Sequence, residues 1–286
     1  MPIVGAISEI WRYPVKSMRG ESLEQCDISK MGILGDRGWA LRDEQSGEIK
    51  GAKKFPTLMQ LQANYLTEPD SDKILKAQIA FPNGESVSSD AADINERLST
   101  YVGSEVTIFP RLPAGDLEHY RRRIPWSEAE LRSVLARESD EELPDFSVMP
   151  QELIAEITEF TSPRGTYFDG YPIHLLTTSW LAELSAMTPT SRFETERFRP
   201  NFVIDGAESG FAEMNWCGKR LRIGDTQLDC DVPTLRCGMT TRATGNLPDD
   251  SQVLRTIVRE SGQNVGTYAT VSNVGSIKLG DEVELL

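Results

Sequence analysis

The chain has 286 residues, and 39% of them are hydrophobic, which is enough to bury the core of one large domain or two ordinary ones. With 30 basic and 44 acidic residues, its formal net charge is -14. That charge excludes general nucleic-acid binding, because such binding needs a net cationic surface. Any anionic ligand must therefore find a local group of basic side chains.

The cysteine content and the first residues bear on the compartment. Four cysteines are present, and no two of them form a CxxC pair. A chain of this length does not need disulfides to fold, so we expect reduced thiols. The opening stretch MPIVGAISEIWRYPVKS has neither the pattern of a signal peptide nor that of a membrane span. We expect a cytoplasmic monomer with no membrane and no nucleic-acid partner.

Residues 1–122 have the pattern of a β-rich first domain, with short apolar runs separated by turn residues. One helix is predicted within it, in the stretch DAADINERLSTYVG. There Ile94, Leu98 and Val102 recur on one helical face, and Gly103 is placed to end the helix.

Residues 123–150 are acid-rich, and Pro144 and Pro150 limit any helix there, so we interpret them as an exposed connecting segment. Residues 151–286 then form the second domain. Its stretch YPIHLLTTSWLAELSAM predicts a short strand that leads into a helix, with Thr178 or Ser179 as the N-cap.

The last third of the chain shows two similar strand patterns. Apolar residues alternate on both sides of a Gly224-Asp225 turn, and the alternation after the turn places Cys230 on the inward face. The tail SIKLGDEVELL repeats this design around Gly280-Asp281, which predicts a second hairpin. Short strands of this spacing favour a closed or partly closed barrel. We therefore predict an α+β fold that is predominantly β, with a few peripheral helices.

Cys237 has two interpretations. Free cysteine is among the most buried residue types and usually packs as a small hydrophobe. However, Arg236 precedes it and the polar stretch GMTTRATG follows it, which indicates a loop rather than a core strand. A neighbouring guanidinium favours the thiolate, the form that attacks or binds metal.

Several separate loops carry basic residues. They are YPVKSMRG with Lys16, Ser17 and Arg19, GDRGW with Arg37, GAKKFP with Lys53 and Lys54, and ERFRPN with Arg197, Arg199 and Asn201. Each loop alone is explained by solvation, but several such loops in an acidic protein favour a converging anion-binding pocket. His174 is interpreted as a core residue. No nucleophile elbow, Walker loop or Rossmann fingerprint is present.

Taken together, YPVKS, GDRGW, FRPN, RC followed by TT, and the closing GSIKLGDEVELL resemble the MOSC family. The resemblance is to its two-part form with an N-terminal MOSC β-barrel region, as in the amidoxime-reducing components and their bacterial relatives. It covers nearly the whole chain and implies a MOSC β-barrel domain in the second half.

The resemblance also implies a molybdenum cofactor, in which a molybdopterin carries molybdenum. Cys237 matches the catalytic cysteine whose thiolate binds the metal. The positions implied to hold the cofactor are Lys16, Ser17, Arg37, Thr177, Arg199, Asn201 and Arg236. A soft thiolate suits a metal that is already bound to sulfur.

The implied activity is that of a molybdenum-dependent oxidoreductase, which removes oxygen from small N-hydroxylated compounds. No cluster-binding cysteines follow the last strands, so we expect an external electron-donor protein, either a reductase, a ferredoxin-like protein or a haem protein. The alternative is a carrier of molybdenum cofactor, or of sulfur as a Cys237 persulfide, without its own reductase activity. A third possibility is a β-rich binding domain in which the cysteine only packs.

Overall fold

Alternating apolar residues build a closed β-barrel of seven strands at the centre of the protein. The computed structural model describes residues 1–286. Around the barrel the strands follow the order β1, β12, β11, β15, β14, β13 and β17, and β17 pairs again with β1. Their bounds are β1 (Ile3–Arg12), β11 (Ile173–Thr177), β12 (Phe202–Asp205), β13 (Arg220–Ile223), β14 (Thr226–Leu235), β15 (Asn264–Asn273) and β17 (Glu282–Leu285). Closure leaves the barrel without a free edge, and it confirms the predicted fold class.

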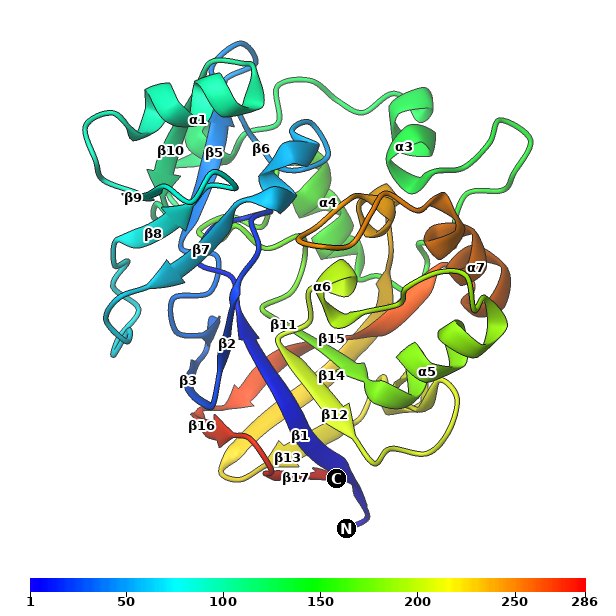
Figure 1. Ribbon diagram of the computed structural model, residues 1–286. Helices are drawn as coiled ribbons and strands as arrows, with labels where there is room; N and C mark the ends of the chain where they lie inside the picture. The colour runs from blue at the N-terminus through cyan, green and yellow to red at the C-terminus, as the bar shows by residue number, and fades with distance from the viewer.

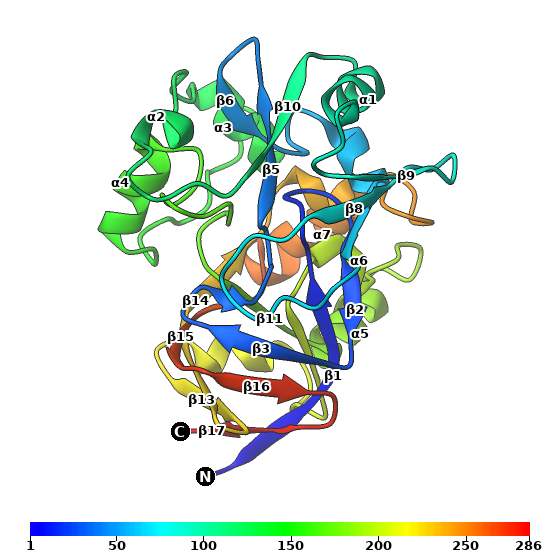
Figure 2. The ribbon, with the colours of Figure 1, turned by 90° about the vertical axis from the view of Figure 1, so that its left-hand side faces the viewer.

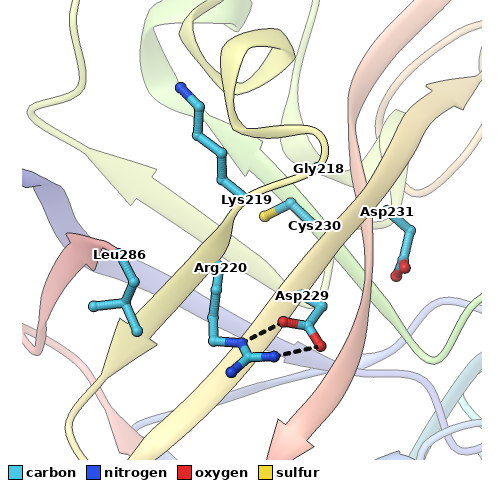
Figure 3. Close-up of a pocket in the computed structure, with 7 residues that line it drawn as sticks. All are labelled: Gly218, Lys219, Arg220, Asp229, Cys230, Asp231 and Leu286. Carbon is cyan, nitrogen blue, oxygen red and sulfur yellow. Dashed lines mark hydrogen bonds and ion pairs between the residues drawn. The ribbon is translucent and has the colours of Figure 1, made fainter.

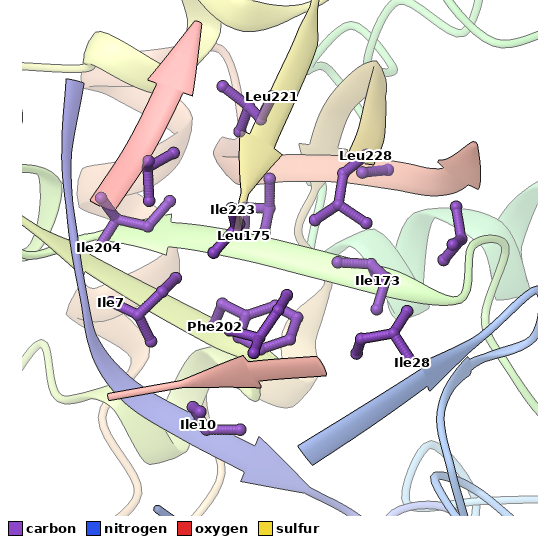
Figure 4. Packing of buried hydrophobic residues seen from close by; sticks show 14 of the residues in the cluster. Ile7, Ile10, Ile28, Ile173, Leu175, Phe202, Ile204, Leu221, Ile223 and Leu228 are labelled. Atoms are coloured by element: carbon purple, nitrogen blue, oxygen red, sulfur yellow. The ribbon is translucent and has the colours of Figure 1, made fainter. Parts of the chain in front are cut away.

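The inside of the barrel is filled by branched aliphatic side chains from every strand (Figure 4). Strand β14 alternates between buried and half-buried residues along its whole length, and Leu228, Cys230 and Val232 point inward. The predicted inward position of Cys230 is therefore confirmed. The first predicted hairpin is confirmed too, since β13 and β14 pair with Leu221 opposite Leu228.

The second predicted hairpin is wrong. The tail forms strands β16 (Gly275–Lys278) and β17, but they do not pair with each other. Strand β16 pairs with β3 (Gln25–Ser29), while β17 pairs with β1 and β13. The physical reason lies in the turn: the Gly280 amide donates to the Ile7 carbonyl, and the Ile7 amide donates to Asp281. The turn is thus bonded to β1, and the two strands leave it toward different sheets.

The first part of the chain has a core of its own, above the barrel in Figure 2. Its elements are β5 (Trp39–Asp43), β6 (Glu48–Lys50), η1 (Pro56–Gln60), β7 (Gln62–Tyr65), β8 (Ala77–Ala80), β9 (Ser86–Ser88), α1 (Ile94–Val102) and β10 (Val106–Pro110). Strands β2 (Glu21–Leu23) and β4 (Gly32–Ile33) lie on the barrel side, where β2 pairs with β1 and β4 with β3. Helix α1 is the predicted one: Ile94 and Leu98 are buried, and Gly103 ends it with a φ of 71°.

Strand β1 crosses the predicted domain division, because it opens the chain and yet lies in the barrel formed by the second half. The connection between the two parts contains α2 (Leu117–Tyr120), α3 (Glu128–Leu135) and α4 (Gln151–Glu159). Most residues of 123–150 are exposed or half-buried. The division into 1–122, 123–150 and 151–286 stays a prediction.

The remaining helices cover the outside of the barrel (Figure 1). They are α5 (Thr178–Met187), α6 (Thr195–Phe198), η2 (Ala212–Trp216), η3 (Gly238–Thr241) and α7 (Ser251–Ser261). The N-cap of α5 is Thr177, whose hydroxyl accepts a hydrogen bond from the Trp180 amide, so the predicted cap at Thr178 or Ser179 is wrong. The cap comes earlier because no loop separates the two elements: β11 ends at Thr177 and α5 begins at Thr178. None of the helices has the length and apolar composition that crossing a bilayer requires.

Candidate functional site

The candidate site lies where loops from both parts of the chain meet. Lys16 and Ser17 follow β1, Arg37 precedes β5, Arg199 and Asn201 join α6 to β12, and Arg236 and Cys237 follow β14. Ser17, Arg37 and Arg199 have φ values of 71°, 49° and 56°, which non-glycine residues rarely adopt. Such backbone persists only where its surroundings over-determine it, and it gathers at functional sites.

Two of the predicted arginines lie against one tyrosine ring. The guanidinium carbon of Arg199 is 4.2 Å from the centre of the Tyr13 ring, and that of Arg37 is 5.0 Å from it. The Tyr13 hydroxyl donates to the Pro200 carbonyl at 3.0 Å, and the ring is buried. Burial lowers the pKa of Arg199 to about 10, which still leaves it charged at neutral pH. Tyr13 therefore holds two cations side by side.

A buried carboxylate ties these loops together. Asp36 accepts hydrogen bonds from the Tyr13 amide at 2.7 Å and from the Asn201 side-chain amide at 3.0 Å, and it also pairs with Arg37. The Asn201 side-chain oxygen accepts from the His174 amide at 3.1 Å. Asn201 is thus a structural link between the first part of the chain and the barrel.

Lys16 points at the segment just before β11. Its ammonium donates to the Tyr167 carbonyl at 2.8 Å and to the Asp169 carboxylate at 2.7 Å. Burial lowers the pKa of Lys16 below its ordinary value. The surrounding protein disfavours a charge on Asp169, but Lys16, Lys53 and Arg37 outweigh this effect and lower its pKa. The Asp169 side chain is 71% exposed, so this carboxylate remains open to solvent at the edge of a cationic group.

Ser17 contacts a neighbouring loop at close range. Its hydroxyl accepts a hydrogen bond from the Ala52 amide at 2.9 Å. A Cβ at Gly51 would lie 2.4 Å from the Ser17 hydroxyl oxygen, so only glycine allows this approach. Lys53, in the same loop, is exposed and lies 5.0 Å from the Trp126 ring centre.

Cys237 is the second residue after β14, which ends at Leu235, and it precedes the η3 turn. It is half-buried, and its carbonyl accepts a hydrogen bond from the Thr240 hydroxyl at 3.1 Å. Arg236 donates to the Phe198 carbonyl at 2.8 Å, whereas its Nε is buried without any hydrogen-bond partner. A buried donor without a partner is costly, and it marks a place where a ligand atom could be bound.

Tyr268 connects the cysteine side of the site with the cationic side. Burial raises its pKa to about 12, with further charge effects from Arg236, Asp169, Arg37 and Cys237. Its ring lies 5.5 Å from that of His174 and stacks on Tyr171. His174 is buried, with Nε2 3.2 Å from the Val265 carbonyl, which agrees with its interpretation as a core residue. The Tyr268 phenol therefore stays protonated at neutral pH and can donate a hydrogen bond.

Arg197 donates hydrogen bonds to the loop after Cys237 and pairs with no anionic side chain. It is buried and has no carboxylate partner. Its guanidinium donates to the carbonyls of Arg192, Thr240, Arg242 and Pro248, three of which belong to the loop after Cys237. The same short stretch then supplies Arg199 and Asn201, so it couples the cysteine loop to the cationic group.

The structure does not bring Thr177 to this group. Thr177 lies at the far end of β11, where its amide and hydroxyl donate to the buried Glu213 carboxylate at 2.8 and 2.6 Å. Sequence reasoning missed Tyr13, Asp36, Asp169 and Tyr268. The only sequence signal for Asp36 is its place beside Arg37 in GDRGW, and Asp169 stands in the turn-like stretch FDGYP. For the two tyrosines we find no sequence signal.

A surface groove lies elsewhere. It has a volume of about 510 Å³ on the outer wall of β13 and β14, and an exposed Arg220–Asp229 pair crosses it (Figure 3). None of the predicted site residues lines it. A smaller pocket of about 160 Å³ is lined by Tyr13, Arg19 and Arg199, among others. The convergent cations, rather than groove size, therefore define the candidate site.

Comparison with known proteins agrees with this location. The model of the MOSC N-terminal beta barrel domain matches residues 4–107, and that of the MOSC domain matches residues 163–284. The chain belongs to the MOSC family. The two matches leave residues 108–162 of this MOSC protein outside either domain model.

Several known proteins are similar to this MOSC protein at low identity. The mitochondrial amidoxime reducing component 2 of Rattus norvegicus is 26% identical, with 98% of this chain and 83% of that protein covered. The mitochondrial amidoxime-reducing component 1 of Homo sapiens is 24% identical, with 99% and 83% covered. The molybdenum cofactor sulfurase of Oryza sativa is 25% identical, with 85% of this chain and 28% of that protein covered. The YUAD protein of Bacillus subtilis covers 98% of this chain and 94% of its own, with a TM-score of 0.44 and 12% identity.

The residues present fit a molybdopterin-type ligand. Such a ligand is an anion, and Lys16, Arg37 and Arg199 gather charge-assisted donors in a protein whose net charge is strongly negative. The unpartnered Arg236 Nε provides a further donor, and it belongs to the residue that precedes the half-buried Cys237. The thiol is the soft ligand that a sulfur-bound metal prefers.

Proposed function

We propose that this MOSC protein is a molybdenum-cofactor-dependent oxidoreductase that reduces small N-hydroxylated compounds with electrons from a separate donor protein. The observation that supports this most is that Arg37 and Arg199 lie against the Tyr13 ring and Lys16 pairs with Asp169. Arg236, the residue before Cys237, donates to the carbonyl of Phe198, which precedes Arg199. The names of the amidoxime-reducing relatives point to the same chemistry. The overall change is R–NHOH + 2 electrons + 2 H⁺ → R–NH2 + H2O.

In this proposal the chain binds and orients, and the cofactor supplies the two-electron chemistry and oxygen-atom removal. Cys237 provides the thiolate ligand to the metal. Lys16, Ser17, Arg37, Arg199 and Arg236 hold the anionic pterin group, and Asn201 fixes the loop that carries Arg199. Thr177 does not enter the proposal, because Glu213 occupies its hydroxyl.

Two further groups act at the edge of the site. The protonated Tyr268 phenol can donate a hydrogen bond to a bound oxygen or nitrogen atom. The Asp169 carboxylate stays charged at neutral pH and is open to solvent, so it can accept a hydrogen bond from an N–H or O–H group of a substrate. Both lie within the field of the Arg37 charge.

The activity is tested with protein from a cofactor-competent host and reduced methyl viologen as the electron donor. We expect faster oxidation of the viologen with benzamidoxime, N-hydroxyguanidine or hydroxylamine than without substrate. The same rates with and without substrate across this panel would contradict the reductase proposal.

A second candidate function has one observation in its favour, the match to a molybdenum cofactor sulfurase. In that case the protein would carry the cofactor, or sulfur as a persulfide on Cys237, without reduction chemistry of its own. Mass spectrometry that finds a stable extra sulfur atom on Cys237, with no bound pterin, would favour the carrier.

The four cysteines are all free in the structure, and reduced thiols are typical of a reducing compartment. We therefore propose a cytoplasmic location.

A further inference from the structure

Strained backbone surrounds this site and points to a residue that the proposed function does not use. The non-glycine residues with positive φ are Ser17, Arg37, Arg199, Ala136 and Gln263. The first three belong to the candidate cofactor site. Ala136 and Gln263 do not, yet they too lie next to the turn that carries Cys237. A non-glycine residue in this region needs a reason, which is often functional.

Gln263 is fully buried, and each of its polar groups has a partner. Its side-chain Nε2 donates to the carbonyls of Leu135 and Arg236, both at 2.9 Å. Its Oε1 accepts from the Arg137 guanidinium at 2.7 Å. Its own carbonyl accepts from the Arg236 amide at 2.8 Å, and its amide donates to Ile257 at 3.1 Å. A residue so fully bonded at a φ of 72° is held in one conformation.

These bonds fix the peptide that precedes the cysteine. The carbonyl of Arg236 belongs to the peptide bond that joins it to Cys237, and both the amide and the carbonyl of Arg236 are bound by Gln263. The regular pairing of β14 with β15 ends at Leu235 opposite Asn264. Gln263 therefore continues the hydrogen bonding beyond the end of the sheet. Without it, the amide and the carbonyl of Arg236 would lose these two bonds.

The same side chain also anchors the connecting segment to the turn. Leu135 and Arg137 stand at the end of α3, and a Cβ at Gly238 would lie 3.4 Å from the Val134 carbonyl. Residues 108–162 belong to neither domain match, so this wall of the site is contributed by the connection.

We propose that Gln263 is a positioning residue for Cys237, which holds the Arg236–Cys237 peptide in place and joins it to the end of α3. This positioning role of Gln263 rests on the proposed function of Cys237 as a metal ligand. The effect of Gln263 on the reactivity of the Cys237 thiol does not require the cofactor. A glutamine that only stabilised the fold would protect all buried cysteines equally. A positioning residue protects Cys237 in particular.

The test compares the alkylation rates of individual cysteines by iodoacetamide in the full chain, produced in a host that lacks the cofactor and read by peptide mass spectrometry. Cys26 and Cys230 are buried in the barrel core and report unfolding of the whole protein. Gln263→Met keeps the length of the side chain and removes its amide. All three side-chain hydrogen bonds of Gln263 are lost, and one of them holds the Arg236–Cys237 peptide. We expect the Cys237 rate to rise roughly two- to tenfold, as for the loss of that one bond, with no matching rise at Cys230.

Two other variants keep this test decisive. Ile223→Ala opens a cavity in the barrel core, whose cluster includes no residue of the cysteine turn, and should raise the rates of Cys26 and Cys230 at least as much as that of Cys237. Arg137→Met removes only the partner of Oε1, so a smaller rise at Cys237 is expected even if Gln263→Met does not fold. An unchanged ratio of Cys237 to Cys230 in every variant that folds would overturn the proposal. Absence of molybdenum or of reductase activity would instead count against the proposed function alone.

Discussion

The side-chain amide of Asn201 donates a hydrogen bond of 3.0 Å to the buried carboxylate of Asp36, and it thereby joins the loop before β5 to the barrel strand β12. The two residues are 165 positions apart in the chain. Arg37 and the Tyr13 amide share the same carboxylate, so this single contact sets the relative position of three site loops.

We therefore expect Asn201→Ala to lower the free energy of unfolding by about 1–3 kcal/mol, because Asp36 would lose a partner while it remains buried. Urea unfolding followed by circular dichroism measures this change. Asn215→Ala, at an exposed position, is the matched control and should have little effect. Equal free energies of unfolding for the two variants would contradict a stabilising role of the Asn201–Asp36 hydrogen bond.

Arg197 is expected to be a second determinant of the site. Arg197→Met should lower the free energy of unfolding by roughly 2–4 kcal/mol, because buried loop carbonyls lose charge-assisted hydrogen bonds. Arg192→Met breaks an exposed pair with Glu194 and an exposed hydrogen bond to the Asn246 carbonyl, and should cost about 0.2–1 kcal/mol. Urea unfolding separates the two. Similar losses for both variants would contradict this role of Arg197.

The pH dependence of stability should carry the signature of Glu213. Burial raises its pKa to about 7, while the unfolded chain has an ordinary carboxyl pKa. The folded state therefore binds more protons than the unfolded state between about pH 4.5 and 7, and stability falls as pH rises through this range.

The expected loss from this group is roughly 3 kcal/mol between its two pKa values. Glu213→Gln removes the titration. The free energy of unfolding of the variant minus that of the wild type should therefore increase as pH rises from 4.5 to 7. Unfolding titrations in urea at several pH values measure the difference. A difference that is flat, or that changes in the opposite direction, would show that Glu213 titrates normally.

Lys16 should decide how much pterin the protein retains. Lys16→Gln removes one charge-assisted donor from the proposed anion site, and the affinity should fall about 10- to 100-fold. The fluorescence of oxidised pterin released from purified protein measures the content. Lys30→Gln is the control, since Lys30 also donates to backbone carbonyls but lies beside β15. Equal pterin in both variants would remove Lys16 from the site.

Local patterns in the sequence were sufficient for several elements. The alternation around Cys230 predicted the β13–β14 hairpin, and the helical spacing of Ile94 and Leu98 predicted α1. The hairpin and the helix are each formed by residues close together in the sequence, and each buries one face, so a local pattern is enough to predict them. The tail strands show the same alternation, but alternation does not specify the partner strand, and β16 pairs with the distant β3.

The basic loops of the candidate site could be named from sequence, but their connections could not. Asp36 and Asn201 are 165 residues apart and meet only in the folded chain. The hydrogen bonds of Gln263 to Leu135 and Arg236 likewise join distant segments, which local sequence patterns do not report. Thr177 illustrates the same limit, since its hydroxyl is used by Glu213 from a distant segment. Whether the gathered residues bind a cofactor stays a prediction.

The most direct test of the central claim is the molybdenum and pterin content of protein purified from a cofactor-competent host, compared between wild type and Cys237→Ser. Elemental mass spectrometry and pterin fluorescence give the two amounts. The account predicts nearly one molybdenum and one pterin per wild-type chain, with the metal lost from the variant. If the wild type contains neither under conditions that load a known molybdoenzyme, or if the variant retains as much metal as the wild type, the central claim is contradicted.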